Sequence, residues 1–191
     1  MRWLTLYARS RRLPAALAAL AAGAAAVWWL ARFGDGGTAG PRTSALVLAG
    51  GVMVLSPGLG GPDPALDRTA AIRWPLHRTA HVLLCALLAG SVLLALRAAD
   101  GQPPDPGFVL RDAAGLAGLA ALGAACLGPP YAWLPPFGCL AAALTVPPGP
   151  DPVIRILTWP VLPPGTAPAG WTALALAVTG TAAYALAGPR R

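Results

Sequence analysis

HRTAHVLLCALLAGSVLLAL, residues 77–96, is the stretch that decides the fold of this chain. It runs for 20 residues without an acidic side chain, and its arginine, Arg78, stands near the start. About 20 consecutive apolar residues are what an α-helix needs to cross the hydrocarbon core of a bilayer. The whole chain shares this character, because 56% of its 191 residues are hydrophobic and only 11% are charged. The charges stand in short stretches between apolar runs, so the sequence predicts a membrane protein whose loops alone meet water.

Five more apolar runs are predicted as spans by the same criterion. With residues 77–96 they predict an all-α integral membrane protein, one polytopic domain over residues 1–191 with about six transmembrane helices. In the fourth run, small residues recur every four positions and predict a stripe where another helix packs closely: Ala113, Ala117, Ala121 and Ala125. In the fifth, Pro135 and Pro136 predict a kink or a break. The predicted spans cover residues 14–31, 44–59, 77–96, 108–127, 131–146 and 169–187.

The arginines predict the orientation, because the cytoplasmic loops of membrane proteins carry an excess of positive charge. With six spans and a cytoplasmic amino terminus, nine of the 14 arginines fall on the cytoplasmic side and five on the outer side. Three of the outer five, Arg32, Arg97 and Arg111, stand at span ends and are predicted to reach the interface. Most tryptophans also fall near span ends, whereas Trp159 falls in an outer loop. We therefore expect both termini in the cytoplasm.

The first residues, Met1 to Arg12, are predicted to form a short interfacial helix. Its aromatic residues Trp3 and Tyr7 share one face at helical spacing, while its arginines lie largely on the other. The alternative is the basic region of a signal peptide that is cleaved near residues 24–26. Because the apolar run continues to Leu30 and more spans follow, we favour an uncleaved anchor.

The chain contains no Lys, no Glu and no Asn, which is the bias of a GC-rich genome. Without Lys there is no Walker A lysine and no Schiff-base lysine, and without Glu there is no HExxH metalloprotease site. Neither Ser56 nor Ser91 stands in a GxSxG setting. We therefore expect no enzymatic activity in this chain. The net charge of +7 follows from the positive-inside rule, so nucleic acid is not an expected partner.

Two connections are longer than the others. The cytoplasmic loop between the second and third spans predicts a short charged helix over residues 65–74 between flanking prolines. This helix either docks on a cytosolic partner or rests on the inner leaflet. The outer segment 147–168 contains the apolar stretch Val153 to Trp159, which is too short to span. We predict that this stretch forms a re-entrant or interfacial helix in the outer leaflet, because a loop rarely exposes such residues to water.

These features, in this order, resemble the transmembrane subunits of type-2 ATP-binding-cassette exporters. In that family an elbow helix precedes the first span, a coupling helix that docks on the ATPase joins the second and third, and a re-entrant element precedes the last. The stretch from Leu66-Asp67-Arg68 to Arg78 is similar to the coupling region, and Gly170-Trp171 through Gly188 is similar to the last span. The resemblance implies a partner-binding set in the coupling helix: Leu66, Asp67, Arg68, Ile72, Arg73 and Trp74.

The resemblance implies a permease subunit of an ATP-driven exporter in the plasma membrane of a GC-rich bacterium. A separate cytosolic ATPase subunit would bind ATP and Mg, so no cofactor is expected in this chain. A second permease protomer, identical or different, and membrane lipids are the other expected partners. The mostly Ala, Gly, Leu and Val interior favours an amphipathic or apolar cargo.

Polar residues within or near the spans are candidates for a polar pathway: His77, His81, Arg111 and Asp112. Arg111 and Asp112 are either a span-end anchor or a substrate or gating contact, and as helix neighbours they are not expected to pair. An alternative function, a membrane-embedded metal- or haem-binding redox protein, would use His77, His81 and Cys85 on one helix stripe. Ligands spread over that stripe cannot converge on one ion without a kink, so no metal site is predicted. A non-transporting membrane scaffold is the third interpretation.

Overall fold

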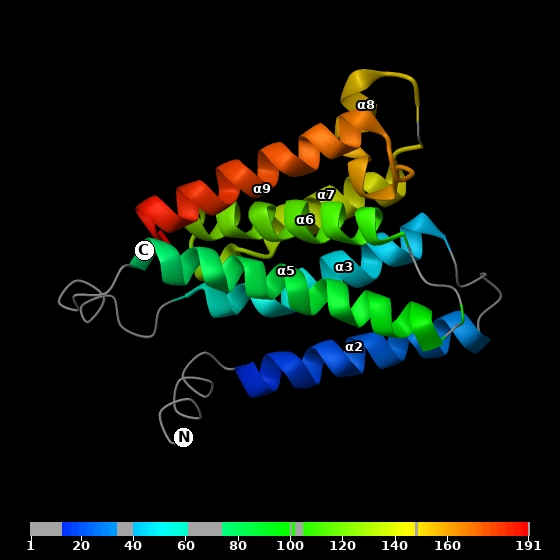
Figure 1. Cartoon of the computed structure of the whole chain (residues 1–191), viewed down its shortest axis with the longest axis horizontal. Coiled ribbons are helices and arrows are strands. Elements are labelled where there is room, and N and C mark those ends of the chain that lie inside the picture. The colour runs from blue at the N-terminus through cyan, green and yellow to red at the C-terminus, as the bar shows by residue number, and fades with distance from the viewer. Residues whose placement is uncertain are drawn as a thin grey trace.

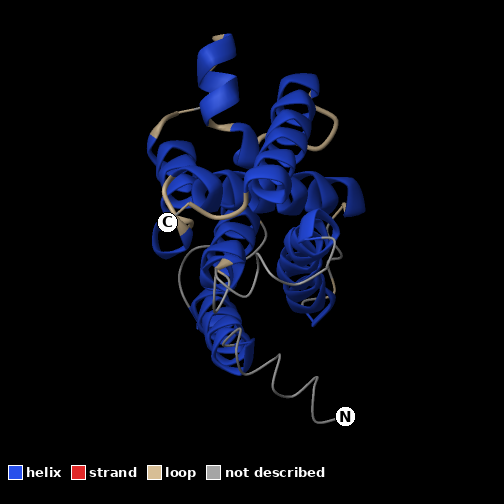
Figure 2. Cartoon of the chain, turned by 90° about the vertical axis from the view of Figure 1, so that its left-hand side faces the viewer, coloured by secondary structure: helices blue, strands red, loops and turns tan. Residues whose placement is uncertain are grey.

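The structure is a computed structural model that describes residues 13–33, 40–60, 74–99, 101, 105–147 and 149–190. Within these ranges every regular element is helical (Figure 2). The elements are α2 (Leu13–Phe33), α3 (Pro41–Leu55), the 3₁₀ turn η1 (Ser56–Leu59), α5 (Trp74–Ala99), α6 (Pro106–Cys126), η2 (Pro129–Tyr131), α7 (Leu134–Thr145), α8 (Pro152–Leu157), η3 (Trp159–Val161) and α9 (Ala167–Ala187). The predicted all-α class is confirmed for the described chain. The predicted interfacial helix over residues 1–12 lies outside the described residues.

Four helical segments are long and apolar enough to cross a membrane, as a multi-pass membrane protein requires. They match four predicted spans to within three residues: Pro41–Leu59, Trp74–Ala99, Pro106–Cys126 and Ala167–Ala187. The other two predicted spans are helical, but their apolar helical stretches are shorter than a membrane crossing requires. The apolar stretch found in α2 is Leu17–Val27, and α7 has 12 residues. At 1.5 Å per residue, α7 is about 18 Å long, short of the ~30 Å hydrocarbon core. Six spans therefore stay a prediction.

Local sequence sets the ends of several helices. Oδ1 of Asp105 accepts a hydrogen bond from the backbone N–H of Gly107 at 2.7 Å and caps α6. Asp151 caps α8 in the same way through the N–H of Val153. A proline follows each aspartate at the first helical position, where no backbone hydrogen bond is lost. α9 ends at Gly188, whose φ of +76° favours glycine.

Pro135 and Pro136 help to begin α7 and do not break it, which corrects the prediction of a kink. α7 starts at Leu134, so both prolines lie in its first turn. There the backbone N–H groups have no partner inside the helix, and proline is tolerated. A tight turn separates α6 from α7, because Gly128 has a φ of +96° and η2 follows it directly.

The helices run back and forth along one direction and form a bundle with α6 at its centre (Figure 1). α6 packs against α9, α5, α3 and α7, and 67% of its apolar stretch is buried, against 28% for α9. α2 lies at one edge beside α3, and α8 lies at the opposite edge beside α9. We call the end that holds the start of α5, η2 and the end of α9 the carboxyl-terminal end. The opposite end, which holds α8, is called the α8 end.

α6 and α9 are in backbone contact. A Cβ atom added to Gly180 would overlap the carbonyl group of Gly118, and one added to Gly118 would overlap the backbone of α9. Small residues allow this approach between membrane helices. The predicted alanine stripe of α6 is largely buried too, but its first member, Ala113, lies beside Gly90 of α5. The α9 contact thus depends on glycines that the sequence analysis did not single out.

Candidate functional site

Arg111, in the second turn of α6 at the α8 end, joins α6 to the segment that precedes α9. Its Nε donates to Oδ1 of Asp112 at 2.7 Å. Its Nη2 donates to the carbonyl of Leu162 at 2.9 Å, and its Nη1 donates to the carbonyl of Pro163 at 3.1 Å. The guanidinium carbon also stands 5.1 Å from the ring centroid of Phe108, within cation–π range. One side chain therefore holds two segments that are about 50 residues apart in sequence.

Arg111 and Asp112 form an ion pair, so the prediction that they do not pair is wrong. Adjacent helical residues point about 100° apart, which was the basis of that prediction. Asp112 is fully buried, whereas Arg111 is 11% exposed. The long arginine side chain spans the angle between them, because a buried carboxylate without a partner is costly.

Asp112 has a partner on only one of its two oxygens. Oδ1 accepts from Arg111, while Oδ2 is buried and has no hydrogen-bond partner. Cys139 of α7 and Trp159 of η3 lie close by, and the indole N–H is within reach of the thiol. Buried ionisable groups inside a membrane protein are costly and are therefore candidates for function. This cluster is the strongest candidate site in the described chain.

The segment before α9 enters the bundle through Trp159. Its side chain is 1% exposed, and a Cβ atom added to Gly115 of α6 would clash with its ring. α8 itself stays at the surface, with Val153 62% exposed. The predicted short helix over residues 153–159 is thus present as α8 followed by η3, and its place in the outer leaflet stays a prediction. Trp159 stands in the predicted outer connection but is not exposed, because η3 packs against α3, α7 and α9 and the indole ring reaches Gly115 of α6.

A second buried polar contact lies between α5 and α3. Nη2 of Arg97 donates to Oγ of Ser44 at 2.9 Å, and Arg97 is only 8% exposed. Arg97 thus packs against α3 at the end of α5, and its position at the membrane interface stays a prediction. Ser44 offers an acceptor inside the bundle, so the guanidinium makes a hydrogen bond there instead of extending into water.

At the carboxyl-terminal end, Arg78 connects the start of α5 to the end of α9. Its Nη1 donates to the carbonyl of Ala185 at 3.2 Å. Its guanidinium also lies against Gly188, where an added Cβ atom would stand 2.9 Å from it. Glycine at this position therefore leaves room for the arginine.

Two further hydrogen bonds connect segments at the carboxyl-terminal end of the bundle. The hydroxyl of Tyr184 in α9 donates to the carbonyl of Leu59 in η1, deep in the bundle. Arg190 donates from Nη1 to the carbonyl of Cys126, at the end of α6, at 2.8 Å. Neither contact was predicted from the sequence. The signal for the first was present, because a tyrosine hydroxyl inside an apolar span needs a partner.

The predicted coupling residues lie almost entirely outside the described residues: Leu66, Asp67, Arg68, Ile72 and Arg73. Trp74, the last of the set, begins α5, and its ring centroid lies 6.3 Å from that of His77. The described chain therefore resumes at the carboxyl-terminal end of the bundle with Trp74, four residues before Arg78.

The four residues predicted to form a polar pathway fall into two separate groups. His77 and His81 stand at the start of α5, whereas Arg111 and Asp112 stand at the start of α6, which runs in the opposite direction (Figure 1). Cys85, the third residue of the alternative metal site, is buried against α2 and α3 residues. Across the described residues, no group of three or more His, Cys, Asp or Glu side chains is placed to hold a metal ion. The structure thus gives the redox alternative no assembled site.

Fold and site together have the features of an all-helical, multi-pass membrane protein with side-chain to backbone contacts at both ends of its bundle. Comparison of the chain with protein-family models, with curated proteins and with solved structures gave no match. What this protein does must therefore be inferred from its own residues.

Proposed function

We propose that this chain is the permease subunit of an ATP-driven exporter similar to the type-2 ATP-binding-cassette class, working with a separate cytosolic ATPase in a bacterial plasma membrane. The observation that carries the proposal is the hydrogen bond from Arg78 to the carbonyl of Ala185, at 3.2 Å. Arg78 follows the predicted coupling segment, residues 66–74, by four positions. A force on that segment would reach the first turn of α5 and, through Arg78, the last turn of α9.

The packing of α9 extends this connection across the bundle. α9 meets α6 backbone to backbone at Gly118 and Gly180. A contact of this kind cannot absorb a displacement by changing rotamers, so a movement of α9 has to move α6 as well. α6 carries Arg111 at its other end, where the side chain holds Leu162 and Pro163. The path from Arg78 through α9 and α6 to Arg111 thus runs from the predicted cytoplasmic side to the predicted outer side.

In this function the segment from Trp159 to Pro163 acts as the outer gate. Arg111 holds the gate closed through two carbonyl groups, and Asp112 orients Arg111. Packed interfaces of this kind switch between discrete arrangements, so a shift of α6 would release the segment as one unit. The cargo class that suits the apolar interior is an amphipathic or apolar molecule. Six spans with both termini in the cytoplasm are part of this proposal.

The test is co-purification of the tagged chain after mild cross-linking of membranes from the source bacterium. An ATPase with a Walker A motif should co-purify with the wild type and be identified by mass spectrometry. The variant Asp67→Asn/Arg73→Gln should recover about tenfold less of it, the effect of losing roughly 1.4 kcal/mol of contact. The matched control is Asp151→Asn/Arg155→Gln, which makes the same charge changes at the α8 end, where the helix cap survives because asparagine also caps.

Retention of the ATPase in the control and its loss in the Asp67/Arg73 variant would support both the exporter and its coupling segment. Absence of any ATPase from the cross-linked wild type would overturn the exporter. Equal loss in both variants would show that the contact does not depend on the coupling segment. Among the described residues, no observation favours the metal- or haem-binding alternative or the scaffold over the exporter.

A further inference from the structure

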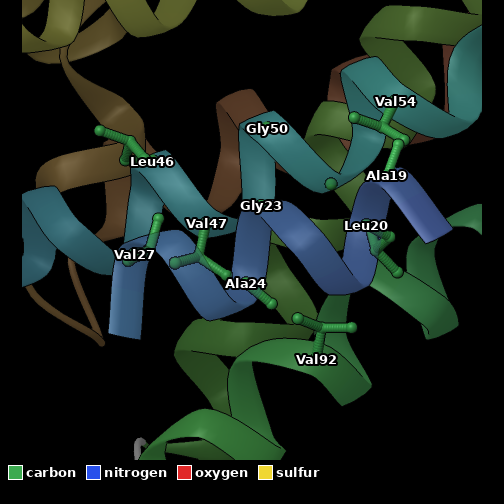
Figure 3. Close-up of a pocket in the computed structure, with 11 residues that line it drawn as sticks. Ala19, Leu20, Gly23, Ala24, Val27, Leu46, Val47, Gly50, Val54 and Val92 are labelled. Carbon is green, nitrogen blue, oxygen red and sulfur yellow. The ribbon is translucent and has the colours of Figure 1, made fainter. Parts of the chain in front are cut away.

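An apolar cavity of about 140 Å³ lies between α2 and α3 (Figure 3). It is lined by eleven residues of α2, α3 and α5, all of them alanine, glycine, valine or leucine. Ala19 and Gly23 of α2 and Leu46 of α3 belong to the lining and are exposed, so the cavity opens to the surface of the bundle. A hydrocarbon lining offers no hydrogen-bond partner, so the group that fills it has to be apolar.

Two glycines of the lining are not explained by packing inside the protein. A Cβ atom added to Gly23 or to Gly50 would meet no atom within 4 Å. The neighbouring Gly51 differs, because its added Cβ would lie 3.2 Å from that of Ala89. Glycine inside a helix is less stable than alanine, and membrane helices use it where two backbones approach. Gly51 serves that purpose, whereas Gly23 and Gly50 keep a space open.

The cavity lies halfway along the two helices that form it. Gly23 is the middle residue of α2, Leu13–Phe33, and Gly50 is the middle residue of the candidate span Pro41–Leu59. When such helices cross a bilayer, their middle residues stand among the ends of the acyl chains. In a bundle whose α2 and α3 both span the membrane, the opening would therefore face acyl chains and not headgroups.

We propose that this cavity binds the terminal part of one acyl chain of a membrane phospholipid. Left empty, the lining would lack dispersion contacts on one side. Apolar cavities of about 150 Å³ in proteins stay dry and admit small apolar groups, so water does not compete for the space. Such a lipid site goes beyond the proposed transport function and does not depend on it.

The bound chain adds to the contact between α2 and the rest of the bundle, which α2 makes with α3 and α5. Of the α2 side chains that the structure describes, Leu20 is the one that is buried, and it packs with Leu55 and Cys85. Val27 is partly buried against the main core, but beside Gly23, between Leu20 and Val27, the space next to α3 is open. An acyl chain in that space would hold the second half of α2 in place.

The test uses a phosphatidylcholine that carries a diazirine at the end of one acyl chain. The delipidated full-length protein in detergent receives one equivalent of this probe, is irradiated and digested, and the labelled residues are mapped by mass spectrometry. Labelling of the cavity lining should exceed severalfold that of Val178, which is exposed near the middle of α9 and serves as a depth-matched control. Gly50→Leu fills the cavity and should reduce its labelling to the level at Val178. Ala175→Leu, on the exposed face of α9, should leave cavity labelling unchanged.

Cavity labelling no higher than that at Val178 would overturn the lipid site, as would undiminished labelling in a folded Gly50→Leu variant. If Gly50→Leu does not fold, the double variant Gly23→Ala/Gly50→Ala replaces it, because both added methyl groups have open space. It should still lower cavity labelling, and unchanged labelling would count against the site. Cross-links that join two protein chains at the cavity would show that a second copy fills it, which also overturns the proposal.

Discussion

Gly180 of α9 faces Gly118 of α6 so closely that a Cβ atom added at Gly180 would overlap the carbonyl group of Gly118. The obstacle is backbone, so no rotamer change relieves it, and the two helices would have to move apart. In a membrane this close approach replaces the hydrophobic effect as the source of helix association. The α6–α9 pair is therefore the part of the bundle that is most sensitive to added volume.

Gly180→Ala should destabilise the protein by about 1–3 kcal/mol, the range for adding volume to a well-packed core. The control is Gly170→Ala in the same helix, where an added Cβ meets nothing within 4 Å. It should be neutral or slightly stabilising, because alanine is the better helix former. Reversible unfolding of both variants by SDS in mixed micelles measures the difference. Equal stability of the two variants would show that the helices of this pair are not in backbone contact.

Arg111→Met should destabilise the protein by about 3–5 kcal/mol, because it leaves the buried carboxylate of Asp112 without its partner. The double variant Arg111→Met/Asp112→Leu removes both charges and should recover part of this loss. The same unfolding measurement on Arg111→Met, on Asp112→Leu and on the double variant gives the coupling energy between the two residues. A double variant as unstable as Arg111→Met would instead assign the cost to the lost contacts with Leu162 and Pro163.

Trp159→Ala should cost about 3–5 kcal/mol, because it empties the buried space beside Gly115 that the indole fills. The matched control is Trp171→Ala in α9, whose side chain is 69% exposed. This control should change the free energy of unfolding by no more than about 0.5 kcal/mol. A similar cost for both tryptophans would contradict the buried position of Trp159.

Hydropathy was enough to predict the all-helical class and four spans to within three residues. It was not enough to predict which polar groups meet, because that depends on the rotation of each helix about its axis. Arg97 and Arg111 both stand near span ends, where the snorkelling rule predicts contact with the interface. Each finds an acceptor within the protein, on Ser44 and on the carbonyl of Leu162. These partners are more than 50 residues away in sequence, so no local sequence pattern predicts the contacts.

Tyr184→Phe should destabilise the protein by about 1–3 kcal/mol, because the buried carbonyl of Leu59 loses the donor that Tyr184 supplies. The control is Tyr131→Phe, since Tyr131 is 55% exposed and its hydroxyl can bond to water. It should leave the stability unchanged to within about 0.5 kcal/mol. A negligible effect of Tyr184→Phe would show that η1 is not tied to α9 through this hydroxyl.

The orientation of the bundle can be read from a native cysteine. Cys126 is exposed at the carboxyl-terminal end of the bundle, whereas Cys85 is buried inside it. In a Cys139→Ala background, a membrane-impermeant maleimide should label Cys126 in inside-out vesicles and not in intact spheroplasts, because an accessible thiol reacts and a buried one does not. Cys85 should react only after denaturation. Arg155→Cys, which adds an exposed thiol at the α8 end, should show the reverse pattern.

Labelling of Cys126 in spheroplasts would show that the orientation of the bundle is opposite to the predicted one. The start of α5, into which the predicted coupling segment leads, would then lie outside the cell, because it shares the carboxyl-terminal end with Cys126. A cytosolic ATPase could not reach that segment, so this result would contradict the exporter proposal. The proposal of a lipid site between α2 and α3 would not be affected. Labelling only in inside-out vesicles would place Arg78 and the end of α9 on the side where ATP is hydrolysed, as transmission from an ATPase through that contact requires.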